Sequence, residues 1–261
     1  MLINTIILFL RDALPVFWVM SLLLAQGNSL RKNPRWIFWT VPFGLILAAL
    51  LMANFAALSN SLMGAGLEWF TFLLHGLIYA LVLVHLFLFR SALNHYWQLS
   101  ATALGVLTIS INGSYFLVFL DTYWRTAQHY WSLITGTILG FGVCFSAGIL
   151  IYLLNYALLQ RGRPLIWVLL LLFWSTGQLI FTFNLLAQAN IISSTSPIWN
   201  TGDWITDSSE LGMVLNTLMG YEATPTLLQI IFYLLCILLP LLLFSITERK
   251  SGAKHKTGVS E

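Results

Sequence analysis

Apolar runs long enough to cross a bilayer recur along the chain, separated by short polar segments. A bilayer core of about 30 Å needs roughly 20 apolar residues per helix. Seven stretches meet this requirement: residues 2–25, 36–58, 69–89, 99–120, 131–154, 164–186 and 226–244. The sequence has no series of alternating ten-residue strands, the pattern typical of a membrane barrel. It therefore predicts an all-α integral membrane protein with seven transmembrane helices.

Six of these helices divide into two groups of three, and a duplicated unit of three must insert in inverted orientation. Residues 9–17 (FLRDALPVF) and 110–119 (SINGSYFLVF) each place a polar cluster with Pro or Gly inside an apolar run. We therefore expect a 3+3 inverted repeat plus one helix. In the fifth stretch, small residues at 136, 140 and 148 predict a face for close helix packing.

Composition agrees with a membrane protein, since 59% of residues are hydrophobic, 8% are charged and the mean hydropathy is +0.85. The net charge of +3 owes much to the tail, which favours a topology anchor near anionic headgroups over nucleic-acid binding. We predict a multi-pass protein of the cell's inner (plasma) membrane. Residues 1–246 form the seven-helix domain, with a long external segment at 188–225, and residues 247–261 form a cytoplasmic basic tail.

Basic residues fix the expected orientation. Ten of the twelve Lys and Arg follow the first, third, fifth and seventh helices: Arg31, Lys32, Arg35, Arg90, Arg161, Arg163, Arg249, Lys250, Lys254 and Lys256. Because basic loops stay in the cytoplasm, the N-terminus should lie outside and the C-terminus inside.

Acidic residues show the opposite distribution. Six fall at or beyond the outer helix ends: Glu68, Asp121, Asp203, Asp207, Glu210 and Glu222. An acidic outer vestibule would concentrate cations. The same distribution also arises when basic residues are simply excluded from external loops, so both interpretations stay open. Within the external segment, residues 209–219 are amphipathic and are expected to lie along the membrane surface.

Arg11, Asp12 and Pro15 interrupt the first apolar run. Each ionisable group at a helix centre costs about 2.5–3.5 kcal/mol to insert, which makes such groups functional candidates. Arg11 and Asp12 point about 100° apart on a helix and need not pair with each other. Pro15 cannot donate to the Arg11 carbonyl, so a free carbonyl beside a carboxylate could bind a cation. A structural Arg or Asp buried in the bundle would give the same pattern.

The third helix places Glu68, Thr71 and His75 on one face, and the fourth adds Asn112 and Tyr115. Such a stripe suits either a cation path or a hydrogen-bonded seam between helices. His85 lies off that face and is expected to be hydrogen-bonded within the bundle. The candidate metal-contacting residues are Asp12, Glu68, His75 and Asn112, and the candidate path residues are Arg11, Pro15, Thr71 and Tyr115.

The sequence has no enzymatic constellation: no Gly-rich phosphate loop, no Ser, His and Asp grouping in an external loop, and no paired haem histidines. We therefore expect a protein that is not an enzyme and has no tightly bound cofactor.

Three segments resemble the high-affinity iron permease family, which works with an oxidase or a periplasmic iron-binding partner. RDALP at 11–15 is similar to the family's first-helix Arg-Glu-Gly-Leu-Glu. GLEWFTFLL from Gly66 is similar to its third-helix Gly-Gln-Glu-Leu-Phe-Glu-Gly, which places Glu68 on the first glutamate. Residues 207–234 resemble its Leu-Gly-x₇-Gly-Tyr-x₃-Pro segment before the last helix. The resemblance implies that iron is the transported substrate.

The chain departs from this family at most of its glutamates. The fourth-helix repeat of Arg-Glu-x-x-Glu becomes Ile111, Asn112 and Tyr115, while Pro15 and Thr71 stand where the first and third helices carry further glutamates. Residues 184–190 also lack the acids usual near the end of the sixth helix. Since iron(III) favours several anionic oxygens, the remaining carboxylate, imidazole and amide groups better suit iron(II) or manganese(II).

The expected function is inward movement of iron or a related metal cation along a path near the first, third and fourth helices, with a periplasmic iron-binding or oxidase partner. The alternative is a non-conducting, permease-like subunit of a membrane iron-handling complex, because a fold can persist after its site is lost.

Overall fold

A computed structural model describes residues 2–90, 96–126, 130–189, 191 and 196–257. The described residues form eight α-helices and one short 3₁₀ helix: α1 (Leu2–Ser29), α2 (Trp36–Asn60), η1 (Leu62–Gly64), α3 (Gly66–Arg90), α4 (Trp97–Thr126), α5 (Tyr130–Gln160), α6 (Pro164–Gln188), α7 (Glu210–Met219) and α8 (Leu227–Thr257). Their only β pairing is an isolated bridge between Pro197 and Thr226. The predicted all-α class is confirmed.

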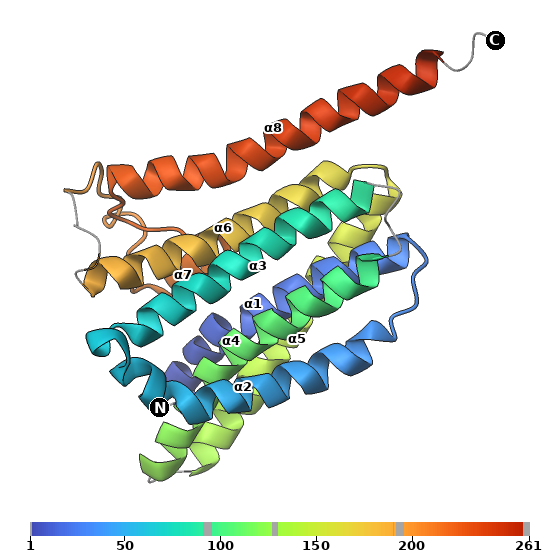
Figure 1. The fold of residues 1–261 in the computed structure, drawn as a ribbon. Helices are drawn as coiled ribbons and strands as arrows, with labels where there is room; N and C mark the ends of the chain where they lie inside the picture. The colour runs from blue at the N-terminus through green and yellow to red at the C-terminus, as the bar shows by residue number, and fades with distance from the viewer. Residues whose placement is uncertain (1, 91–95, 127–129, 190, 192–195, 258–261) are drawn as a thin grey trace.

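Six helices, α1 to α6, are long and apolar enough to cross a membrane. The seventh predicted span falls on α8, where the apolar stretch within the described residues is the shorter Leu227–Leu242. A multi-pass membrane protein is therefore confirmed with six candidate spans. Figure 1 shows α8 running along the outside of the bundle beside α6, and its C-terminal part extends beyond the other helices.

The six helices pack chiefly as three pairs: α1 with α5, α2 with α4, and α3 with α6. α1 packs most extensively on α5, and α4 packs in the same way on α2, while α1 and α4 meet each other and α3 lies beside α6 (Figure 1). α6 is the most enclosed of the six, whereas α2 and α5 leave most of their surface on the outside.

Small residues let these helix pairs approach closely. In α2 the buried positions recur every four residues at 36, 40, 44 and 48, and α5 repeats that register at 136, 140, 144 and 148. A Cβ atom on Gly44 would lie 2.7 Å from Cβ of Ile109 in α4, and one on Gly140 would lie 2.6 Å from Cβ of Phe9 in α1. The packing face predicted in the fifth helix is confirmed.

His85 belongs to a buried polar cluster near the α1–α2 end of the bundle. Its Nδ1 lies 2.7 Å from Oγ of Ser100, and its Nε2 lies 2.7 Å from Oε1 of Gln26. The indole Nε1 of Trp97 donates to that same Gln26 oxygen. Since both ring nitrogens have partners, His85 is hydrogen-bonded within the bundle as expected.

The helix α7 enters the bundle, whereas the sequence predicted that it lies along the membrane surface. Ser209 caps its first turn, with Oγ accepting from the Gly212 amide at 3.0 Å, and Gly220 ends it with a φ of 71°. A Cβ on Gly177 of α6 would lie 2.5 Å from the Gly220 nitrogen. Gly177 lies eleven residues before the end of α6, about 16 Å along the helix, so this contact is deep.

The polar face of α7 explains its position. The Gln178 side chain donates from Nε2 to the Thr217 carbonyl at 2.8 Å, and Asn216 donates to the Tyr221 carbonyl at 2.8 Å. On the membrane surface, water would hydrogen-bond to the polar groups of α7. Here the Gln178 amide of α6 donates to the Thr217 carbonyl of α7 instead. Val214 and Leu218 pack with the Phe9 and Leu14 side chains of α1.

Candidate functional site

A cavity of about 420 Å³ lies between α1, α3, α4, α6 and the segment of residues 196–226 that contains α7, here called the α7 segment. All four candidate metal-contacting residues line it: Asp12, Glu68, His75 and Asn112. Three of the four candidate path residues line it too, namely Arg11, Thr71 and Tyr115. Pro15 does not line the cavity. It is buried within α1, and the helix continues past this proline.

Arg11 and Asp12 form an ion pair with each other, although neighbouring helix positions point in different directions. Arg11 Nε lies 2.7 Å from Oδ1 of Asp12, and Nη2 lies 3.0 Å from Oδ2. The arginine side chain is long enough to fold back over the carboxylate, and its planar fork fits both oxygens. Asp12 is 6% exposed, so the pair places one charge in the bundle and leaves the guanidinium side chain half exposed.

Glu68 lies in the first turn of α3, where the helix dipole stabilises a carboxylate. Its Oε2 atom is buried, and no residue in the described part of the chain donates a hydrogen bond to it. Buried carboxylate oxygens are costly unless a donor or a cation satisfies them. Glu68 is therefore the acid in this cavity that is best placed to receive a positively charged ligand.

His75 lies two turns below Glu68 on α3 and is buried. Its Nδ1 lies 2.9 Å from the Thr71 carbonyl, which can only accept, so Nδ1 carries a proton. With Nδ1 on that carbonyl, Nε2 is the ring atom that faces the Gln178 side chain, to which the imidazole is hydrogen-bonded. A metal ion at Nε2 would therefore displace Gln178. A histidine held through a backbone carbonyl in this way is typical of metal ligands.

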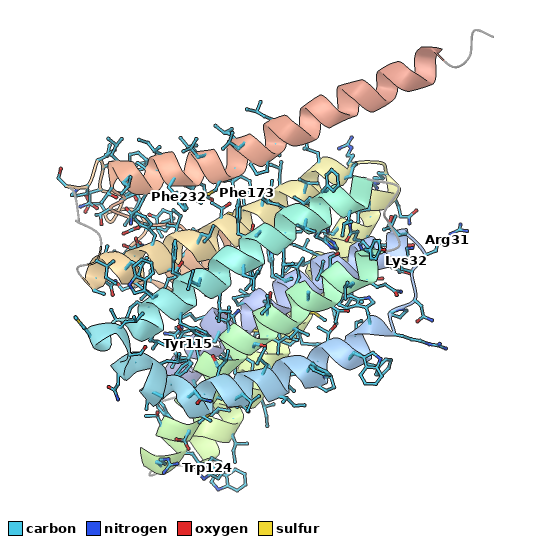
Figure 2. The ribbon with its side chains drawn as sticks, in the orientation of Figure 1. Arg31, Lys32, Tyr115, Trp124, Phe173 and Phe232 are labelled. Carbon is cyan, nitrogen blue, oxygen red and sulfur yellow. The ribbon has the colours of Figure 1, made fainter. Side chains whose placement is uncertain are left out.

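Thr71 and Tyr115 join α3 to α4 across the cavity. The Thr71 hydroxyl lies 2.9 Å from the Tyr115 hydroxyl, and Tyr115 is labelled in the interior of the bundle in Figure 2. The sequence allowed two interpretations of this polar stripe, a cation path or a hydrogen-bonded seam between helices. The contact between Thr71 and Tyr115 is such a seam. The same two hydroxyl oxygens line the cavity, so the seam forms part of its wall.

Asn112 lines the cavity from α4, as Asp12 does from α1. Its Nδ2 donates to the Thr108 carbonyl at 2.9 Å, one turn earlier in the helix. The amide oxygen is consequently the atom that Asn112 can offer to a ligand. Ile111, its neighbour, adds an apolar part to the cavity wall.

Four polar lining residues were missed from sequence: Gln178, Asp207, Asn216 and Thr217. Gln178 was visible as an uncharged polar residue inside the sixth apolar run. Asp207 was noted only as part of an acidic loop. Asn216 and Thr217 belong to α7. Because the sequence predicts that α7 lies on the membrane surface, it does not place these two residues beside the cavity.

The lining carries three carboxylates, Asp12, Glu68 and Asp207, against a single fixed cation, Arg11. With His75 neutral, the formal charge is −2, which favours a cation over an anion. Among the described residues, no group of three or more His, Cys, Asp or Glu side chains lies close enough to hold a metal ion. The donor set therefore lacks the close ligand cluster of a permanent metal centre within those residues.

A second polar cluster joins Glu222, which lies between α7 and α8 and outside the spans, to Asn184 near the end of α6 and Gln229 at the start of α8. Glu222 Oε2 accepts from Asn184 Nδ2 and from Gln229 Nε2, each at 2.9 Å, and Gln229 also donates to Asn184 Oδ1. Burial raises the pKa of Glu222 above its ordinary value, the Asn184 hydrogen bond opposes that shift, and the nearby Asp207 adds to it. An acid thus reaches the end of α6 from a distant segment, although residues 184–190 carry none.

Comparison with known proteins adds no relative: no family model, no curated protein and no solved structure matches this chain.

Proposed function

We propose that this chain is a membrane permease for a metal cation, with iron(II) the leading cargo and manganese(II) the closest substitute. The observation that carries the proposal is the buried Glu68 oxygen without a donor among the described residues, in a cavity with a formal charge of −2. A cation would satisfy this oxygen, whereas a neutral or anionic solute would leave it unpaired.

The ion would exchange part of its hydration shell for side-chain atoms as it enters. Glu68 and Asp207 offer carboxylate oxygens, Asn112 offers an amide oxygen, and His75 offers Nε2. Since no three of the described His, Cys, Asp and Glu side chains lie close enough to hold one ion together, the ion would meet these donors in succession. Imidazole together with carboxylate suits iron(II) and manganese(II), and a site with few close ligands releases its ion readily. Asp12 would serve mainly as the partner of Arg11 until an ion competes for its oxygens.

Packing supports the proposed 3+3 inverted repeat. The contact of α1 with α5 mirrors that of α4 with α2, and the four-residue register of buried positions in α2 recurs in α5. The motifs at 11–15 and 111–115 then face each other across the cavity as equivalent parts of the two repeats.

We also propose that α8 is the seventh crossing. It is 31 residues long, roughly 46 Å at 1.5 Å per residue, which exceeds the bilayer core. With the basic loops in the cytoplasm, the N-terminus lies outside and the α7 segment faces the periplasm of a cell's inner membrane. A periplasmic protein that binds or oxidises iron would deliver the ion there.

Uptake of iron(II) or manganese(II) into proteoliposomes tests the proposal. We expect metal-dependent flux with the natural chain, and a fall of about tenfold or more with Glu68→Gln or Asp12→Ala, corresponding to about 1.4 kcal/mol of lost binding. Asp203→Asn removes an exposed acid of the external segment that does not line the cavity, and it should leave flux unchanged. Absence of metal-dependent flux in the natural chain would reject the permease.

The second candidate is a non-conducting subunit of an iron-handling complex. The ion pair between Arg11 and Asp12 favours it, because a fixed guanidinium competes with any metal for the carboxylate. This second function predicts that the natural chain binds metal without transporting it. Asp12→Ala should then also bind metal and show no flux.

A further inference from the structure

A second large hollow lies on the lipid-facing side of the molecule, away from the cation cavity. It is a groove of about 830 Å³ between α1, α2 and α5. Its walls are mainly aliphatic and aromatic, including Phe17, Leu45, Phe141, Phe145 and Ile149. Several of these side chains are about half exposed, so the groove opens toward the surface that lipid covers.

The groove has the length of one bilayer leaflet. At its apolar end the rings of Phe17 and Phe141 meet with centroids 5.6 Å apart, and at its other end Asn28 meets Tyr152. Eleven residues separate these levels on both α1 and α5, which is about 17 Å of helix. One leaflet contributes about half of the 30 Å hydrocarbon core, so a single acyl chain would fill the groove from end to end.

Apart from Ser21, whose hydroxyl donates to the Gly148 carbonyl, the polar groups gather at the end beside the α1–α2 loop. Asn28 donates from Nδ2 to the Tyr152 hydroxyl at 2.8 Å, and Lys32 completes this end of the lining. Arg31 and Arg35 are exposed on the same loop. Figure 2 labels Arg31 and Lys32 at the end of the bundle away from the α7 segment. Within the described residues no carboxylate forms a salt bridge with Lys32.

We propose that this groove binds one anionic phospholipid, with an acyl chain along α1 and α5 and its phosphate at Lys32. Three basic residues beside the polar end match a negatively charged headgroup. Asn28 and the Tyr152 hydroxyl lie where the ester or glycerol oxygens would reach, and interfacial Tyr and Trp residues favour this depth. The proposal is independent of the permease function, since the groove and the cation cavity share no lining residue.

Native mass spectrometry of the delipidated full chain, with dioleoyl phosphatidylglycerol or dioleoyl phosphatidylcholine added back, tests this site. We expect one phosphatidylglycerol to bind in preference to phosphatidylcholine. Lys32→Gln should lower phosphatidylglycerol occupancy about fivefold, as expected for loss of one basic contact to an anionic lipid. Ile149→Trp should lower the occupancy of both lipids, because the larger ring fills the apolar groove.

Arg161→Gln is the matched control, since it removes the same charge from an exposed position of the α5–α6 connection outside the groove. It should leave the lipid preference intact. Should Ile149→Trp fail to fold, Leu45→Trp fills the groove from the opposite wall on α2. Unchanged phosphatidylglycerol occupancy in Lys32→Gln, equal binding of the two lipids, or a lipid-free dimer that covers the groove would each overturn the proposal.

Discussion

Glu68 and His75 share one face of α3, and their side chains reach the cavity from the same wall. If they bind a divalent cation, the folded protein gains stability by mass action, because the unfolded chain has no such arrangement. At a metal concentration about tenfold above the dissociation constant, the gain is about 1.4 kcal/mol. For a chain of this size we expect the melting temperature to rise by about 2–4 °C.

The check is thermal unfolding in detergent, with and without manganese(II), for the natural chain and for Glu68→Gln. The shift should vanish in Glu68→Gln and persist in Asp203→Asn, which alters an exposed acid elsewhere. A shift of equal size in Glu68→Gln would place the metal at another site. This measurement reports binding alone, so only together with the flux assay does it separate a transporter from a subunit that binds without conducting.

Glu222 makes stability depend on pH in a direction opposite to that of most carboxylates. Its pKa is raised, chiefly by burial, so between the ordinary glutamate value of about 4.3 and the raised value the folded state holds more protons than the unfolded state. Stability is therefore fully present below the ordinary value and is lost as pH rises through the raised one.

The test compares the melting temperatures of the natural chain and Glu222→Gln from about pH 4 to pH 7. The difference between the two proteins reports the stability that Glu222 loses as the pH rises. The variant keeps an oxygen to accept from Asn184 and Gln229 but cannot ionise. Its melting temperature should rise relative to the natural chain with increasing pH. Parallel curves for the two proteins would show that Glu222 does not titrate in this range.

At the scale of elements, the contact between Gly177 and Gly220 holds α7 inside the bundle. A Cβ at Gly177 would press on backbone atoms of Met219 and Gly220, which cannot swing aside as a flexible side chain could. Gly177→Ala should therefore destabilise the protein by about 1–3 kcal/mol and loosen α7. Protease cleavage within residues 196–226 should become faster along with the fall in melting temperature.

Gly142→Ala provides the matched control. Gly142 lies in α5, and a Cβ there would meet no atom within 4 Å. Because alanine favours helix by about 1 kcal/mol over glycine, this variant should be at least as stable as the natural chain. Equal behaviour of the two alanine variants would mean that α7 does not depend on its close approach to α6.

At the scale of the whole molecule, the spans could be predicted because each is an apolar run ended by local signals. Residues 36–58 and 164–186 match α2 and α6 to within two residues. Pro34 and Arg35 precede α2, and Arg163 precedes α6, which begins at Pro164. Helical periodicity also predicts that Glu68 and His75 share one face of α3. That Asp12 and Asn112 line the same cavity depends on how α1, α3 and α4 pack, which spacing within a helix does not give.

The placement of α7 could not be predicted, because it depends on contacts between residues about forty positions apart. Gln178 with Thr217 and Gly177 with Gly220 become partners only when α6 and α7 are already packed together. An amphipathic helix pattern gives one apolar face and does not specify which surface covers it. The pairing of Arg11 with Asp12 was also missed, since helix geometry describes Cβ directions and leaves out the reach of a long side chain.

That pairing has a consequence for how the protein is made. Arg11 and Asp12 emerge from the ribosome together, near the middle of the first helix, before any residue of α3 or α4 exists to neutralise either charge. Because each charge alone would add about 2.5–3.5 kcal/mol to insertion at a helix centre, an adjacent pair lets α1 enter the bilayer as a locally neutral segment. The contact that occupies the Asp12 carboxylate in the finished bundle would thereby also favour insertion of α1 before α3 and α4 are made.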